Sequence, residues 1–312
     1  MSKISIYRMA LSIKAAFDVA KKYGSISNAV CDMRKRTLEG LLDRPGVFNA
    51  ISLVAWLKIV EKADIPFIPA VIKTHMPIDM LIRHDEHHPG DEVYARKFFD
   101  DTADVKPNHM LRWDCCASER LKVLMHESAG YSDDLVKLTP ADMRLFGILV
   151  EYPGDEVAVV ERPWVLARSE GGRPVEYRVF IENNNITGIS NYYVQRPIEL
   201  NMPEVVDCIT KADQILKACI EQNSVPWAMH YDKLFNHGQV SCTIDFLIEK
   251  ETGKAIFIEA GPAFGAGAHP CCFEHNVING KIACFGVALN KEAKPILPGL
   301  LEHVQKALND QW

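Results

Sequence analysis

Two β-like runs joined by a short polar loop limit the fold more than any other feature of this chain. They read "CTIDFLIEKETGKAIFIEAGP", and each run carries one acid among apolar residues, Asp245 in the first and Glu259 in the second. A three-residue hairpin loop at 251–253, with its glycine left-handed, places Lys250 opposite Lys254. The same register predicts that Asp245 lies directly opposite Glu259, with Cβ atoms roughly 5 Å apart.

Two carboxylates this close, flanked by apolar side chains, repel each other and resist loss of water. A divalent cation solves both problems, and Mg²⁺ is commonly held by one or two carboxylates together with substrate phosphates. Asp245 and Glu259 are therefore candidate magnesium ligands. The alternative is a solvated sheet face on which both acids point to water, and a loop one residue longer or shorter breaks the predicted register.

The second half of the chain is rich in β-like runs. "VAVVERPWVLA", "VEYRVFI" and "ITGISNYYVQ" precede the hairpin, and the turn sequences "SEGGRP" and "ENNN" separate them. One long helix is predicted at "MPEVVDCITKADQILKACIEQN", where Pro203 suits the first turn. The pattern predicts an α+β fold whose second half is mostly antiparallel.

The first 65 residues are predicted to be mostly helical, with helices at "ALSIKAAFDVAKKYG" and "VFNAISLVAWLKIVEKADI". The second of these helices is expected to present one apolar face, formed by Phe48, Ile51, Val54 and Leu57. Short strands are expected at "PFIPAVI", "EVYARKFF" and "NHMLRWD", and further helices at "SERLKVLMHESAG" and "TPADMRLFGILVEY". A domain boundary is expected near residue 90.

Composition excludes several classes of protein. The 312 residues have a net charge of −6 and are 48% hydrophobic, which is typical of a globular chain and gives no basic signal for nucleic acid. No apolar run approaches the roughly 20 residues that span a bilayer, and the N-terminus lacks a secretory layout. The nine cysteines show no C-x-x-C spacing, so reduced thiols in a cytoplasm are expected.

Arginines in the β-rich region supply the charge that complements the two acids. Arg178 lies in the middle of "VEYRVFI", and Arg162, Arg168 and Arg196 also interrupt β-like runs. A guanidinium group binds two phosphate oxygens with fixed geometry, so these side chains are candidate phosphate ligands. The alternative for each arginine is an ion pair with an acid on a sheet face.

The order "VVERPW…EYRVFIENNNITGISNYY…TIDFLIEKETGKAIFIEAGP" resembles an ATP-grasp domain over roughly residues 93–273. It is most similar to the arginine/arginine/lysine-signature clade, which includes the eukaryotic assembly chaperone for translation initiation factor two and phage and bacterial proteins. The resemblance implies a nucleotide held between two α+β lobes. On this view residues 91–312 form the nucleotide-binding region, with lobes of about 91–160 and 161–312, and residues 1–90 form a helical region that selects a substrate or partner.

The resemblance also implies roles for individual residues. The strand "VAVVERPWV" is the hinge whose backbone meets the adenine, which makes nucleotide ligands of Glu161, Arg162, Trp164 and Val165. Arg178 matches the arginine of the family's "EFR" strand, and Asp245 and Glu259 match its magnesium ligands. At the family's phosphate-binding lysine "MLRWDCCAS" has Arg112, with Lys97 and Lys122 as alternatives, and Gly261 replaces an asparagine after the Glu.

The activity implied is an ATP- and Mg²⁺-dependent ligase that joins a small-molecule or peptide carboxylate to an amine through an acyl phosphate. Arg178, with Arg112 and Arg196, is expected to neutralise the transferred phosphoryl group. A second hypothesis is a nucleotide-binding assembly factor with a protein partner and no small-molecule turnover. A third is a thiol hydrolase that uses Cys271 or Cys272.

Overall fold

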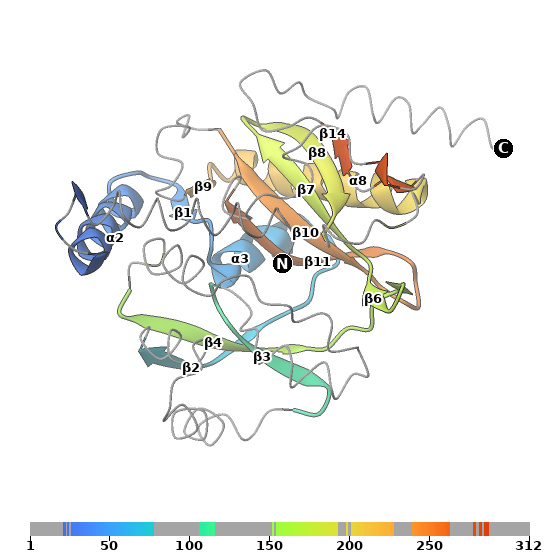
Figure 1. The fold of residues 1–312 in the computed structure, drawn as a ribbon, viewed down its shortest axis with the longest axis horizontal. Helices are drawn as coiled ribbons and strands as arrows, with labels where there is room; N and C mark the ends of the chain where they lie inside the picture. The colour runs from blue at the N-terminus through green and yellow to red at the C-terminus, as the bar shows by residue number, and fades with distance from the viewer. Residues whose placement is uncertain are drawn as a thin grey trace.

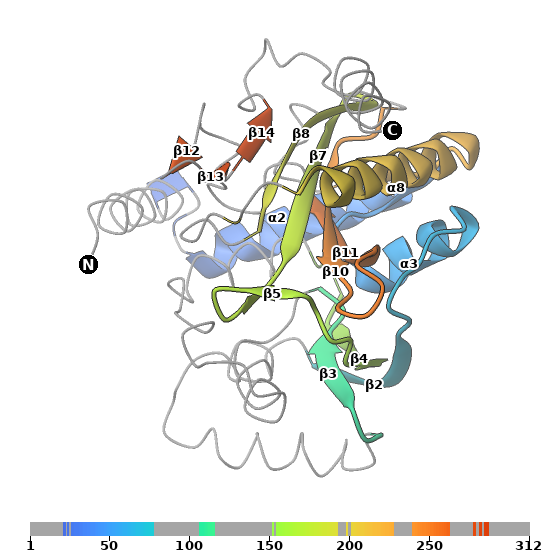
Figure 2. The same ribbon diagram turned by 90° about the vertical axis from the view of Figure 1, so that its right-hand side faces the viewer.

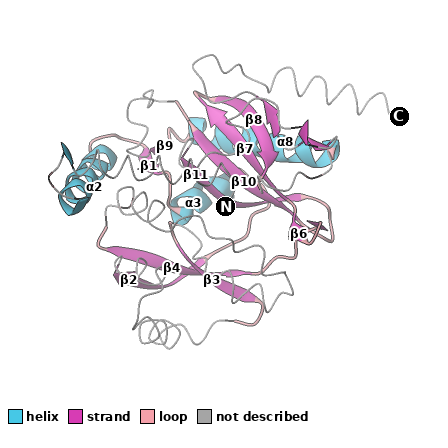
Figure 3. Cartoon of the chain, in the orientation of Figure 1, coloured by secondary structure: helices cyan, strands magenta, loops and turns pink. Residues whose placement is uncertain are grey.

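The computed structural model describes part of the chain, namely residues 21–22, 24, 26–77, 106–115, 152, 154–192, 198, 201–227, 239–262, 277–278, 281–282 and 284–286. These residues form helices and mostly antiparallel sheets, which confirms the predicted α+β class (Figures 1 and 3). The elements expected at 92–99 and 118–130 lie outside the described residues, as do all but the last residue of the one expected at 139–152, most of the first predicted helix and the boundary near residue 90.

A five-stranded antiparallel sheet is the centre of the fold. Its order is β11 (Ala255–Pro262), β10 (Cys242–Ile248), β7 (Glu176–Glu182), β8 (Asn185–Asn191) and β14 (Cys284–Gly286). The predicted "ENNN" turn joins β7 to β8. Its central residues Asn183 and Asn184 have φ of 51° and 63°, the conformation that a tight two-residue hairpin requires and that asparagine tolerates.

Two helices cover one face of this sheet, α8 (Met202–Glu221) and α3 (Leu53–Lys62) (Figure 2). Between them and the sheet lies the apolar core, which takes every second residue of the strands. Tyr177, Val179 and Ile181 of β7 and Ile244 and Phe246 of β10 all face the helices. The intervening residues of these strands, Arg178 and Asp245 among them, therefore face the other way.

A three-stranded sheet lies below the five-stranded sheet in the views of Figures 1 and 3, in the order β2 (Val71–Pro77), β4 (Glu156–Pro163) and β3 (His109–Trp113). The chain passes between the two sheets at two places. Residues 66–68 run beside β11, where Ile68 N donates to Phe257 O at 3.1 Å, and then enter β2. Residues 164–168 leave β4 and run beside the end of β10, where Lys250 N donates to Leu166 O at 2.9 Å.

The remaining strands pair in twos, β1 (Val47–Asn49) with β9 (Val225–Trp227), β5 (Ser169–Glu170) with β6 (Arg173–Pro174), and β12 (Val277–Ile278) with β13 (Lys281–Ile282). The strands β1 and β2 of the predicted N-terminal region thus pair with strands from later in the chain. The strand β4 crosses the predicted lobe boundary at residue 160. None of the described helices is long and apolar enough to cross a bilayer.

The helix predicted to begin near residue 47 begins at Leu53 instead. Ser52 caps it by accepting a hydrogen bond from Ala55 N at 3.2 Å, and the preceding residues pair with β9 as β1. The predicted apolar face is therefore partly wrong, because Phe48 lies on a strand and contacts Trp56 edge-on at 4.9 Å. The buried residues of α3 are Leu53, Trp56, Ile59 and Val60. A second helix precedes this region, α2 (Ile26–Leu42).

Candidate functional site

The predicted pairing of the two acids is confirmed, although the loop that was expected to set it is different. Asp245 lies directly opposite Glu259. Nearer the loop, however, the ladder pairs Ile248 with Ala255, and Glu249 N donates to Lys254 O at 2.9 Å, so the predicted pairing of Lys250 with Lys254 is wrong.

A β-bulge restores the register between the two acids. Asp245 pairs with Glu259 whereas Phe246 pairs with Phe257, so Ile258 is the extra residue on β11. The left-handed glycine predicted for the loop is present, because Gly253 has a φ of 66°. The acids meet because a four-residue loop and a one-residue bulge offset each other.

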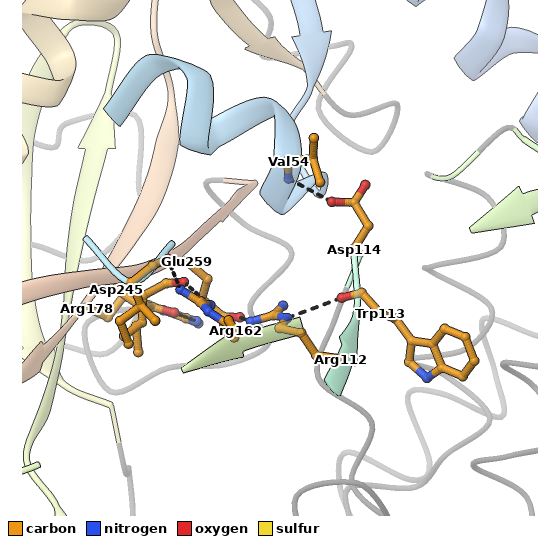
Figure 4. Close-up of polar contacts among 10 residues, drawn as sticks. Val54, Arg112, Trp113, Asp114, Arg162, Arg178, Asp245 and Glu259 are labelled. Carbon is orange, nitrogen blue, oxygen red and sulfur yellow. Dashed lines mark hydrogen bonds and ion pairs between the residues drawn. The ribbon is translucent and has the colours of Figure 1, made fainter. Parts of the chain in front are cut away.

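A row of polar side chains crosses four strands at this level. Glu259 lies opposite Asp245, Asp245 lies opposite Arg178, and Arg178 lies opposite Ser190. The row is on the face away from α3 and α8, because its neighbours along each strand point into the core. Opposed residues of adjacent strands share a face, so acids and arginine stand side by side on the sheet (Figure 4).

Arg178 and Asp245 form a buried bidentate ion pair. Nε and Nη2 of Arg178 donate to the two carboxylate oxygens at 2.6 and 2.5 Å, and the residues are 7% and 1% exposed. Burial alone lowers the pKa of Arg178, but the Asp245 carboxylate outweighs it and raises that pKa. The Tyr192 ring lies 4.7 Å from the guanidinium carbon. These contacts hold the arginine in one orientation.

Arg112 reaches the row from the three-stranded sheet. Its Nη1 donates to Glu259 Oε2 at 2.7 Å, and its Nε donates to the carbonyl of Trp113 at 3.2 Å (Figure 4). The Arg112 side chain is 6% exposed and that of Glu259 is 26% exposed. Glu259 is thus the more accessible of the two acids, and its ion pair joins β3 to β11.

Arg162 is a buried cation that binds main-chain oxygens. Its Nη1 donates to Ile258 O at 2.8 Å and its Nη2 to Ile68 O at 2.7 Å. Its Nε is buried and has no hydrogen-bond partner among the described residues. Burial and the nearby Arg112 lower the pKa of Arg162 to about 9, while the Glu259 carboxylate acts in the opposite direction. One of its acceptors belongs to the bulge residue, so Arg162 stabilises the segment that positions Glu259.

The other predicted hinge residues are not all in this cluster. Glu161 precedes Arg162 on β4, so the two side chains point to opposite faces of the sheet. The Glu161 carboxylate lies 3.2 Å from Lys73 Nζ and accepts a hydrogen bond from Lys106 N at 2.9 Å. Trp164 and Val165 are half-buried in the segment that connects the two sheets, where Trp164 N donates to Asn108 O at 2.7 Å. Their roles toward a nucleotide stay predictions.

Several predicted residues lie outside the described part of the chain, namely Arg196, Lys97, Lys122, Cys271 and Cys272. Arg168 is described, and it follows the alternative reading of an ion pair, since its Nε lies 2.7 Å from Glu204 Oε1 at the start of α8. Two described contacts were not predicted, that of Tyr192 with Arg178 at the site and that of Lys73 with Glu161 outside it. Alternation along β8 could have placed Tyr192 on the face of Arg178, whereas the sequence around Lys73 carries no comparable signal.

The donor set fits a metal that takes most of its ligands from phosphates and water. The described residues hold no group of three or more His, Cys, Asp or Glu side chains able to bind a metal. Of the paired acids, Glu259 is exposed enough to meet a cation, while both oxygens of Asp245 accept from Arg178. Mg²⁺ bound to nucleotide phosphates needs only one or two carboxylates. The three guanidinium groups exceed the two carboxylates by one positive charge, which favours an anionic ligand.

Comparison with known proteins gives similarities of fold. A scan against protein-family models found no match, and a search of the curated proteins found none either. Among solved structures, Cdc123 from Schizosaccharomyces pombe is similar at 13% identity and a TM-score of 0.39, over 70% of this chain and 87% of that one. D-alanine–D-alanine ligase from Bacillus anthracis, complexed with ATP, is 11% identical with a TM-score of 0.33, over 70% and 56%.

A RimK domain ATP-grasp protein from Sphaerobacter thermophilus is also similar, at 10% identity and a TM-score of 0.32, over 68% of this chain and 58% of that one. All three structures have TM-scores below 0.5 and identities below 25%, so these similarities assign the chain to no family. None of them defines an activity for this chain.

Proposed function

We propose that this chain binds ATP with Mg²⁺ between its two sheets and joins a carboxylate to an amine through an acyl phosphate. The observation that carries the proposal is the row of Glu259, Asp245 and Arg178 on one sheet, met by Arg112 and Arg162 from the other. Such a cluster offers fixed cations to phosphate oxygens and an accessible carboxylate to a metal.

Each residue has a distinct task in this reaction. Arg178, held by Asp245 through two hydrogen bonds, presents Nη1 to the γ-phosphoryl group as that group passes to the substrate carboxylate and ADP leaves. Arg112 offers a second cation to the phosphates, the role that the sequence resemblance gives to a lysine. Arg196 is expected to help neutralise the transferred phosphoryl group, as predicted from the sequence. Mg²⁺ supplies charge neutralisation at the phosphates when it is bound, with Glu259 as its protein ligand and Asp245 beside it.

The amine nitrogen then forms the new bond to the acyl carbon, the bond between that carbon and the phosphate oxygen breaks, and inorganic phosphate leaves together with the proton that the amine loses. Exclusion of water protects the acyl phosphate during this step. The substrates are small-molecule or peptide carboxylates and amines, as the sequence resemblance implies.

An ADP-release assay tests the proposal. The protein is incubated with ATP, Mg²⁺ and pools of amino acids, short peptides and polyamines. We expect ADP and phosphate release that requires both a carboxylate and an amine and that Glu259→Gln abolishes. Glu39→Gln is the matched control, because Glu39 is an exposed acid on α2 in an ion pair with Lys35. Absence of ADP release from every pool refutes the ligase reaction.

A second candidate is a nucleotide-binding assembly factor without small-molecule turnover. It is favoured by the engagement of both acids with arginines and by Gly261, which offers no side-chain oxygen where the ATP-grasp pattern has an asparagine. In that case ATP with Mg²⁺ raises the melting temperature of the protein, but no combination of substrates releases ADP.

A further inference from the structure

The Arg178–Asp245 and Arg112–Glu259 ion pairs of the site differ in their hydrogen bonding and in their burial. Asp245 and Arg178 share two hydrogen bonds within one sheet, and their side chains are 1% and 9% exposed. Glu259 and Arg112 share a hydrogen bond of 2.7 Å between different sheets, and the Glu259 side chain is 26% exposed. A buried bidentate pair is costly to separate, whereas a partly exposed contact exchanges partners more readily.

The positive charge around Glu259 bears on which ions it can bind. Arg112 contacts its carboxylate, and the buried Arg162 adds a second cation near it. A metal cation that approaches Glu259 in the free protein competes with Arg112 for the carboxylate and is repelled by both arginines. Phosphate oxygens change this balance, because they are alternative acceptors for the guanidinium group of Arg112.

Building on the proposed function, we propose that the Arg112–Glu259 ion pair makes cation binding at this site dependent on a polyphosphate. Arg112 turns from Glu259 to a phosphate oxygen, and Glu259 then turns to the divalent cation. Arg178 and Asp245 keep their mutual contact throughout. The free protein therefore discriminates against a bare divalent cation, and each of the two ligands increases the affinity for the other.

This coupling has an expected size. Coupling between two ligands is reciprocal and is typically about 5- to 150-fold in affinity. Loss of the charge-assisted hydrogen bond between Arg112 and Glu259, together with the repulsion between Arg112 and the metal cation, corresponds to a change in affinity of about tenfold or more. We therefore expect the wild-type protein to bind ATP at least fivefold more tightly with Mg²⁺ than with a chelator, and Glu259→Gln to bind ATP equally in both conditions.

Manganese binding without nucleotide tests the ion pair directly. Electron paramagnetic resonance measures Mn²⁺ bound to wild type, Arg112→Gln, Arg112→Lys and the double variant Arg112→Gln/Glu259→Gln. We expect Arg112→Gln to bind Mn²⁺ about tenfold more tightly than wild type, and the double variant to lose the gain. Arg112→Lys, which keeps a cation, is expected to remain near wild type. Arg36→Gln is the control, since it releases Asp32 on α2 from a comparable 2.8 Å pair.

Equal Mn²⁺ affinity of Arg112→Gln, wild type and the Arg36→Gln control overturns the inference. If Arg112→Gln does not fold, calorimetric titration of ATP into wild type and Glu259→Gln, each with Mg²⁺ or with a chelator, decides it, and equal ratios for the two proteins overturn it. If wild type binds no ATP, the proposed function is wrong, while the Mn²⁺ comparison still supports or overturns the effect of Arg112 on Glu259.

Discussion

Replacing Arg162 with methionine removes the buried cation that connects three segments of the fold. The guanidinium donates from β4 to Ile258 O on β11 and to Ile68 O on the chain that leads into β2. Arg162 is 3% exposed. Methionine fills much of the same space with an unbranched apolar side chain but offers no donor, so both carbonyl oxygens lose a partner that water cannot easily replace.

The magnitude follows from the two hydrogen bonds. A hydrogen bond from a charged donor contributes about 1.5–3 kcal/mol, so the pair contributes about 3–6 kcal/mol. Removal of a buried cation that lies close to Arg112 returns part of this free energy. We therefore expect Arg162→Met to lower the free energy of unfolding by about 2–4 kcal/mol, a large share of the stability of a typical domain.

Urea unfolding followed by tryptophan fluorescence measures this change, because Trp56 and Trp113 are both fully buried. Arg162→Lys keeps the charge but lacks the planar fork that reaches two carbonyls, so an intermediate loss is expected. Arg36→Gln removes an exposed arginine on α2 and is expected to change stability by less than about 0.5 kcal/mol. If Arg162→Met is as stable as wild type, Arg162 is not what holds the bulge.

Three further changes test other parts of the fold. Asp245→Asn leaves the buried Arg178 without its carboxylate. We therefore expect the free energy of unfolding in urea to fall by about 3–5 kcal/mol, and calorimetry to show weaker Mg²⁺-dependent binding of ATP. If neither value changes, the assignment of Asp245 and Arg178 to the site is wrong. Burial alone raises the pKa of Glu161, but hydrogen bonds from Lys106 N and Lys73 lower it. Stability from that carboxylate is therefore present above its ordinary pKa and lost as pH falls below about 4, so wild type should lose more stability than Glu161→Gln between pH 5 and 3. Gly253→Ala meets no neighbouring atom but forces a φ of 66° on alanine, which predicts a loss of about 1 kcal/mol in thermal or urea unfolding.

Local signals in the sequence located much of the five-stranded sheet. Alternation of apolar residues identified β7, β8, β10 and β11, and the asparagine pair at 183–184 identified the turn between β7 and β8. The helix α8 was also predicted from its periodicity and from Pro203 in its first turn. These features depend on residues within about a dozen positions of one another, so a single stretch of sequence contains the information.

The register between the two acids depends on contacts between residues far apart in the sequence. The predicted loop placed Asp245 opposite Glu259, and the structure agrees, but it does so through a different loop and a bulge at Ile258. The bulge lies where Arg162 supplies a donor to its carbonyl oxygen. A partner nearly 100 positions away along the chain stabilises the bulge, and no local pattern around Ile258 indicates it.

The types of side chain at the site, three arginines and two acids on β-like runs, could be read from the amino-acid order, because strand alternation and turn chemistry are local. Their partners could not. Asp245 binds Arg178 from a neighbouring strand, Glu259 binds Arg112 from another sheet, and Glu161 points to Lys73 and away from them. The packing of distant segments selects each of these contacts, because a charged side chain buried on a sheet pairs with whichever opposite charge the fold brings within reach.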